Sequence, residues 1–140
     1  MNNVQSRRLA ANEIKQILEG ADLLYGLSLT NGQIASTNKV LFWRNGIQNK
    51  AGFDKNTYVI FTITASPQAT NADNKVKTRE VTVSIDIYTN KDLNTKELIK
   101  MVDKIENDLV DNNWDVEYET EEFDNDSQIN HIPLTVTKYF

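Results

Sequence analysis

The 140-residue chain contains no cysteine, one histidine, two prolines and five glycines. Without cysteine it can form neither disulfides nor thiolate metal sites, and it has no cysteine nucleophile. With one histidine, a transition-metal site would have to be built from carboxylates. The scattered glycines form no phosphate-binding loop and flank no serine as in a nucleophile elbow. We therefore predict that the protein is not an enzyme and needs no cofactor.

Long apolar runs are also lacking. No stretch approaches the roughly 20 apolar residues that a membrane-spanning helix needs. The apolar residues of "MNNVQSRRLAANEIKQILEG" are spaced rather than clustered, unlike those of a signal peptide. A hydrophobic content of 39% with 25% charged residues is typical of soluble globular proteins. We expect a single domain over residues 1–140, made and kept in a cytoplasm and without membrane contact.

The net charge of −5 is unevenly distributed along the chain. Residues 110–126 hold eight acids and no base, and the rest of the chain is mildly positive. Tight nonspecific DNA binding needs several cations that neutralise phosphates. The acidic balance therefore argues against a protein that grips DNA, although DNA could still pass nearby.

Hydrophobic periodicity predicts two helices and five strands in the order α-β-β-β-α-β-β. The helices are expected at 8–20 and 94–110, with Leu98, Val102, Ile105 and Leu109 as the buried stripe of the second, widened by Ile99 and Met101. The strands are expected at 40–44, 57–64, 81–88, 114–122 and 131–139. Residues 57–64 and 81–88 should pair as an antiparallel hairpin. We interpret 24–39 as a loop with a short extended piece. We interpret 65–79 as a long polar loop, and loops of this length are often functional.

The stretch "WDVEYETEE" alternates between apolar and acidic residues. Asp115, Glu117, Glu119 and Glu121 share one parity, and we call these four residues the acidic face. Alternate strand residues lie about 6.6 Å apart on one side, so the carboxylates repel each other unless water or cations screen them. We favour a solvated face over a loose cation site, and both over a catalytic pair, because a catalytic carboxyl is usually buried.

Two other groups of residues have both a structural and a functional interpretation. His131 could be a ligand or base, but a lone histidine is more often a structural hydrogen-bonding residue. "FWR", residues 42–44, could be a stacking patch for nucleic acid, but a short buried strand explains it equally simply. We favour the structural interpretation in both cases.

Three basic residues, Lys75, Lys77 and Arg79, end the polar stretch 65–79. They could be the solvated stem of a loop. They could also meet an acidic neighbour, and the chain's own acidic face makes self-association a natural candidate.

The order of these motifs resembles the tail-terminator, or tail-completion, proteins of long-tailed, non-contractile bacteriophages. The resemblance covers about residues 56–140. It is carried by "YVIF" at 58–61, by "VSIDIYT" at 83–89, and by Asp124, Asp126 and His131 in a late acidic turn and strand. Asn113-Trp114 stands where the family often has Gly-Phe. Residues 22–55 match no pattern of the family.

The resemblance implies an α+β fold with a mostly antiparallel sheet of about four or five strands and two helices packed on one face. It also implies a homohexameric ring that caps the tail tube, ends tail polymerisation and joins tail to head. The expected partners are further copies of the chain, the major tail-tube protein and a head–neck connector protein. The protein would be located in the virion, in the tail or neck, after assembly in the host cytoplasm.

In such a ring, DNA would pass through the lumen without specific binding, since a carboxylate-rich wall repels phosphate. Whether the acidic face lines the lumen or the outside is left open. We expect contacts between subunits or with the tail tube at Gln68, Asn71, Asp73, Lys75, Lys77 and Arg79. The alternatives are a head-side connector protein of the neck and a small non-viral binding module with ferredoxin-like topology.

Overall fold

The computed structural model describes residues 3–20, 24–28, 34–39, 41–44, 58–66, 68–72, 75–90, 95–124 and 129–140. The two helices are α1 (Asn3–Gly20) and α2 (Thr95–Asp111). The strands before α2 are β1 (Leu24–Ser28), β2 (Ile34–Lys39), β3 (Leu41–Arg44), β4 (Tyr58–Ala65), β5 (Gln68–Ala72) and β6 (Lys75–Asn90). Those after it are β7 (Asp115–Tyr118), β8 (Glu122–Asp124) and β9 (Ile129–Tyr139).

The main sheet has the strand order β3-β4-β6-β9-β7. Strands β4, β6, β9 and β7 run antiparallel to their neighbours, and β3 adds a parallel edge to β4. With the two helices, these five strands follow one another in the predicted order α-β-β-β-α-β-β, but the chain also contains β1, β2, β5 and β8, which were not predicted. The fold is α+β, and the predicted hairpin of β4 and β6 is confirmed.

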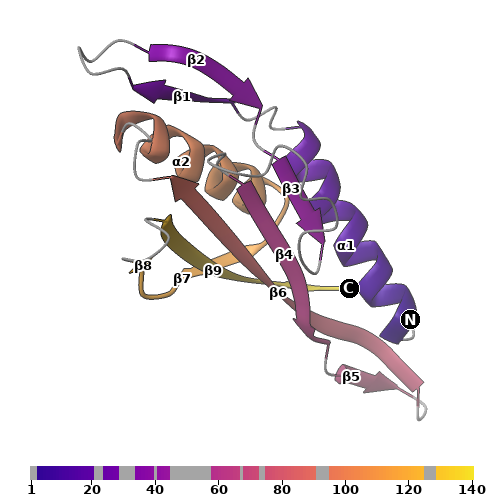
Figure 1. Ribbon diagram of the computed structural model, residues 1–140. Helices are drawn as coiled ribbons and strands as arrows, with labels where there is room; N and C mark the ends of the chain where they lie inside the picture. Colours follow the sequence, from indigo (N-terminus) through magenta and orange to yellow (C-terminus); the bar gives the residue numbers. More distant parts are fainter. Residues whose placement is uncertain are drawn as a thin grey trace.

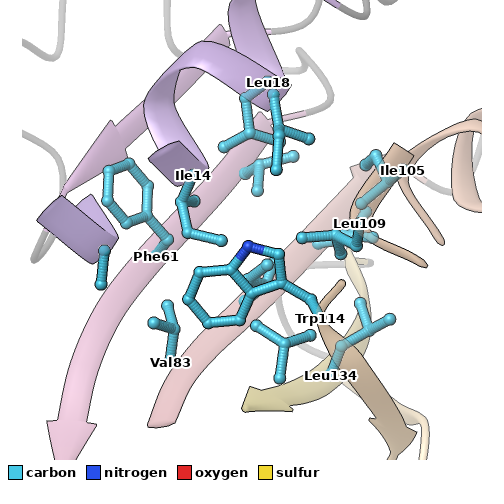
Figure 2. Close-up of a cluster of buried hydrophobic side chains, with 14 of the residues drawn as sticks. Ile14, Leu18, Phe61, Val83, Ile105, Leu109, Trp114 and Leu134 are labelled. Atoms are coloured by element: carbon cyan, nitrogen blue, oxygen red, sulfur yellow. The ribbon is translucent and has the colours of Figure 1, made fainter. Parts of the chain in front are cut away.

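Both helices cover the same face of the sheet (Figure 1). Apolar residues at alternate positions of β4, β6 and β9 meet α1 and α2 in one core, in which Ile14, Ile85 and Leu134 are fully buried. Trp114 lies between the two helices, close to Leu109 (Figure 2). The alternation of apolar and polar residues in the strands follows from this one-sided cover.

Helix α2 ends in a Schellman motif that delivers Trp114 to the core. Asn113 has a φ of 66°, its N–H donates to the Val110 carbonyl, and the Trp114 N–H donates to the Leu109 carbonyl. Glycine is the usual residue in this left-handed conformation, and asparagine tolerates it better than most other residues. The left-handed conformation of Asn113 therefore explains the turn that places Trp114 in the core.

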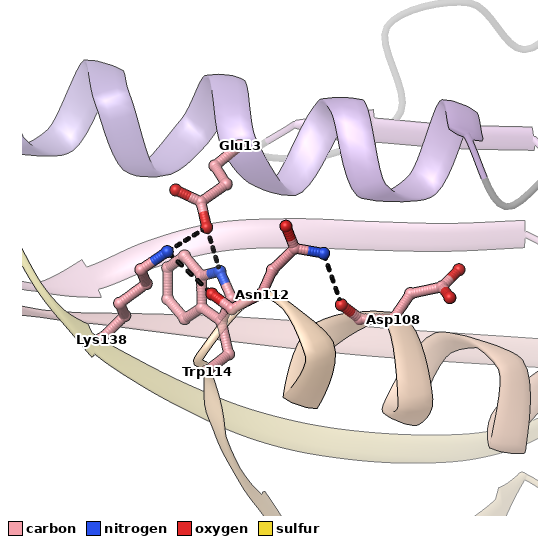
Figure 3. A network of polar contacts seen from close by, with 5 residues as sticks. All are labelled: Glu13, Asp108, Asn112, Trp114 and Lys138. Atoms are coloured by element: carbon pink, nitrogen blue, oxygen red, sulfur yellow. Dashed lines mark hydrogen bonds and ion pairs between the residues drawn. The ribbon is translucent and has the colours of Figure 1, made fainter.

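A polar network joins the two helices above Trp114 (Figure 3). The indole Nε1 donates to Glu13 Oε1 at 3.1 Å, and Lys138 bridges Glu13 and the Asn112 carbonyl. Glu13 belongs to α1, whereas Lys138 comes from the end of β9. The contacts of these residues are internal, so we assign them a structural role.

Several sequence-based expectations need correction. The stretch 24–39 contains the two-stranded sheet of β1 and β2, and the predicted loop 65–79 contains β5 and the first part of β6. The acidic strand is shorter than predicted because β7 ends at Tyr118. Ile99 is 55% exposed and does not widen the buried stripe of α2, whereas Met101, Ile105 and Leu109 are buried as expected.

Candidate functional site: the open face of the sheet

The second face of the sheet is not covered by either helix, and we call it the open face. It carries the residues of the other parity, among them Ser84, Asp86 and Tyr88 of β6 and His131 and Thr135 of β9, all half-buried. The register places Tyr88 opposite His131 and Ser84 opposite Thr135. Polar and aromatic side chains from distant parts of the sequence are thereby brought together on one surface.

An aromatic row crosses three strands of the open face. Tyr58 of β4 stacks on Tyr88 of β6 at 4.7 Å between ring centroids, and Tyr88 stacks on His131 of β9 at 4.5 Å. Such cross-strand aromatic pairs stabilise a sheet and fix its register. Burial, with a smaller contribution from Tyr88, raises the pKa of Tyr58 to about 12.

His131 is held by Asp86 as well as by the stack. Its Nε2 lies 2.7 Å from Asp86 Oδ1, and the Ser84 hydroxyl donates to Asp86 Oδ2 at 3.2 Å. In a serine hydrolase, the imidazole lies between the serine and the carboxylate. Here the carboxylate lies between them, so this arrangement does not give Ser84 a general base.

A shallow hollow of about 900 Å³ lies over this part of the open face. Its lining residues are Ser84, Asp86, Glu117, Tyr118, Glu119, Thr120, His131 and Pro133. Three of these described lining residues are carboxylates, and none of them is lysine or arginine. The hollow therefore favours a cationic group over an anionic one.

The residues of the acidic face border this hollow or lie close to it in sequence. Asp115, Glu117, Glu119 and Glu121 are all exposed, although only the first two belong to β7. Glu119 accepts a hydrogen bond from the Thr135 hydroxyl at 2.8 Å. Among the described side chains, no group of three or more acidic or histidine residues is arranged to hold a metal ion.

Two tyrosines near this surface have raised pKa values. A hydrogen bond to Glu80, the charge of Glu80, slight burial and the charge of Asp115 raise the pKa of the exposed Tyr139. Burial, followed by a hydrogen bond to Glu106, raises the pKa of Tyr118. The Tyr118 hydroxyl donates to Glu106 of α2 at 2.7 Å, so this side chain connects the rim of the hollow to the helix layer.

The predicted interface residues lie on a separate feature, the arm formed by β5 and the first part of β6. Gln68 and Asn71 belong to β5, and Lys75, Lys77 and Arg79 belong to β6. Asp73 lies outside the described residues. The arm projects beyond the helix-covered body (Figure 1), and in the described part of the chain β5 pairs only with β6.

The base of the arm is fixed to the body. Arg79 donates from its guanidinium to the Ser66 carbonyl at 2.9 Å, and Arg7 of α1 donates to the Ser66 hydroxyl at 2.9 Å. The Ser66 hydroxyl in turn donates to Asn3. Backbone bonds between Arg79 and Phe140 complete the base. Arg79 is therefore engaged within its own chain, and its role at an interface stays a prediction.

Sequence reasoning missed the Asp86–His131 pair and the aromatic row. Asp86 and Tyr88 share one parity of their strand, and the buried Ile85 and Ile87 share the other. Which residue lies opposite them depends on the β6–β9 register, and 45 residues separate Asp86 from His131. Only the register could have shown that these side chains meet.

Comparisons with known proteins add no assignment. No protein-family model matches the chain, and a search of curated proteins finds no match. None of the described helices is long and apolar enough to cross a membrane. The resemblance to tail-terminator proteins therefore rests on the residue patterns alone.

Proposed function

We propose that the protein is a structural virion protein that forms a ring on the end of a phage tail tube. The ring ends tube polymerisation and provides the surface for joining the tail to the head. The resemblance over residues 56–140 suggests this role, and two properties of the fold support it independently. They are the projecting arm and the open, anionic face of the sheet.

The arm is the observation that carries the proposal. A two-stranded hairpin by itself is only marginally stable in water. This arm consists of β5 and β6 alone among the described elements, yet its base is held firmly by Ser66, Arg7 and Arg79. A firmly anchored hairpin that extends beyond the core is suited to bind a neighbouring molecule.

The open face supplies the second requirement of a tail-end ring. Carboxylates at Asp115, Glu117, Glu119 and Glu121 are exposed to solvent. A surface of this charge repels the phosphates of DNA, so DNA can pass without being held. The mechanism is one of shape and charge, without a chemical step.

Tube assembly tests the proposed function. Tail-tube protein polymerised with the wild-type chain should give tubes of limited length with annular density at one end in electron micrographs. A matched variant replaces residues 69–78 by Asn-Gly, which closes the hairpin at the Gln68–Arg79 pair with a tight turn. This variant should melt like the wild type and leave the tubes overlong. Tubes that elongate equally with and without the wild-type protein would contradict the proposal.

A further inference from the structure

The hollow on the open face and the arm are complementary in charge. We propose that the hollow receives the Lys75–Lys77 stretch of the arm from a second copy of the chain. This inference rests on the proposed function, because it names the contact that joins neighbouring subunits of the ring. Asp86, Glu117 and Glu119 line the hollow, and none of the described lining residues is a lysine or arginine. The arm contributes the two lysines at alternate positions of β6.

The occupant must come from another molecule. Lys75 and Asp86 belong to the same unbroken strand and are separated by eleven residues. At about 3.3 Å per residue, the arm's lysine lies about 36 Å along the strand from the hollow of its own chain. The arm of one copy can therefore fill only the hollow of a different copy.

The arm is prepared for this contact. Its base is fixed by the hydrogen bonds of Ser66 to Arg7, Arg79 and Asn3, which ties the β4–β5 junction to α1. A segment that is already ordered loses less conformational entropy on binding. Because Arg79 is used in this anchor, the charge argument rests on Lys75 and Lys77, the two lysines of the arm.

The hollow is equally suited to a lysine chain. The Ser84 hydroxyl donates to Asp86, and His131 contacts the same carboxylate. The Thr135 hydroxyl donates to Glu119. These contacts orient the two carboxylates, and none of the three comes from a lysine or arginine. Each carboxylate has about four acceptor positions, so one or two hydrogen bonds leave capacity for an ammonium group. His131 and Pro133 provide the apolar surface that the lysine methylenes can cover.

The contact is heterologous, since the arm and the hollow are different surfaces. Repeating such a contact generates either a closed ring or an open filament. One subunit thus binds the next with no symmetry between their two contact surfaces.

Site-specific cross-linking tests the contact directly. The chain has no cysteine, so Thr78→Cys on the arm and Thr120→Cys at the hollow introduce unique thiols and leave the charges intact. A mixture of the two full-length variants, treated with a short bismaleimide, should give a heterodimer. Its yield should exceed by at least about tenfold that of Thr78→Cys mixed with Asn107→Cys on α2. Equal yields in the two mixtures would overturn the inference.

Charge reversal separates a specific contact from random collision. Adding Lys75→Glu and Lys77→Glu to the arm variant should lower the cross-linking yield by about tenfold. Adding Glu117→Lys and Glu119→Lys to the hollow variant should then restore most of it. The proposed charge pairing would be contradicted if reversing the arm charges left the cross-linking yield unchanged. It would also be contradicted if reversing the hollow charges, in folded proteins, did not restore the yield.

The outcomes for the contact and for the function are distinguishable. Tubes that are capped normally, with no arm-to-hollow cross-link, would refute this contact and leave the proposed function standing. A strong cross-link with uncapped tubes would support the contact and refute the tail-end role. An arm that cross-links to tail-tube protein but not to a second copy would also overturn the inference.

Discussion

The two faces of the sheet are made by the same strands but differ in what they bury. On the covered face, Val83, Ile85 and Leu134 are fully buried beneath two helices. On the open face, their neighbours Ser84, Asp86 and Thr135 remain half-exposed and form hydrogen bonds. The comparison suggests a division of labour in which one face supplies stability and the other is available for contacts.

The largest expected effect on stability comes from a substitution at Leu134 of β9. Its neighbour Thr135 lies on the opposite face and provides the comparison. Leu134→Ala should lower the free energy of unfolding by about 2–5 kcal/mol, because it leaves a cavity in the core. Thr135→Ala on the open face should lower it by less than about 1 kcal/mol. Urea denaturation monitored by tryptophan fluorescence measures both. Equal losses would break the distinction between the two faces.

Tyr58 sharpens the comparison because it is on the open face yet only 8% exposed. Its folded-state pKa of about 12 exceeds the ordinary value of 10, so the unfolded chain ionises first as pH rises. The stabilising contribution is complete below pH 10 and is lost between pH 10 and about 12. This contribution amounts to at most about 3 kcal/mol.

Tyr58→Phe should therefore reduce the loss of stability on raising the pH from about 9 to about 11. Urea titrations at the two pH values measure this difference. Part of the alkaline loss should persist, since the pKa values of Tyr118 and Tyr139 are raised as well. A pH dependence unchanged by the substitution would show that Tyr58 is not buried in solution.

A smaller effect is expected where α2 turns Trp114 toward the covered face. Asn113→Gly should stabilise the protein by about 0.5–1 kcal/mol because the φ of 66° suits glycine. Asn113→Ala should destabilise it by about 1 kcal/mol, since a Cβ without a compensating polar group disfavours this conformation. Thermal melting of the two variants gives the sign directly, and a stabilising Asn113→Ala would contradict the observed turn.

The smallest effect should come from the acidic face. The double variant Glu117→Gln, Glu119→Gln removes two exposed charges from a crowded row and should change the free energy of unfolding by less than about 0.5 kcal/mol. Any gain should shrink as salt is added, because exposed charges are screened. A large loss of stability at all salt concentrations would mean that these side chains are structural.

The sequence predicted the parts of the fold in which hydrophobic periodicity and secondary structure agree. The apolar runs of β4 and β6 and the periodic stripe of α2 were enough to place the hairpin and the second helix. The arm was missed because "QATNA" and "KVKT" lack an apolar alternation. They form strands as a continuation of the β4–β6 hairpin, which a local pattern does not reveal.

The length of the acidic strand shows a different limit. Alternation continues to Glu121, but β7 ends at Tyr118, opposite Leu134. The next residue of β9 is Pro133, which has no N–H for the ladder, although its carbonyl accepts from Glu119 at 3.1 Å. The acidic residues were correctly expected to be exposed, whereas the end of the strand depended on a proline 15 residues away.

The most direct test of the central claim is carboxyl footprinting of the protein alone and in complex with the tail tube. Labelling with a carbodiimide and a small amine, followed by mass spectrometry, measures the reactivity of each carboxylate. We predict that Asp86, Glu117 and Glu119 lose reactivity on assembly, while Glu19 of α1 and Asp103 of α2 keep theirs. Protection of the helix carboxylates, with the open face equally reactive in both states, would contradict the account.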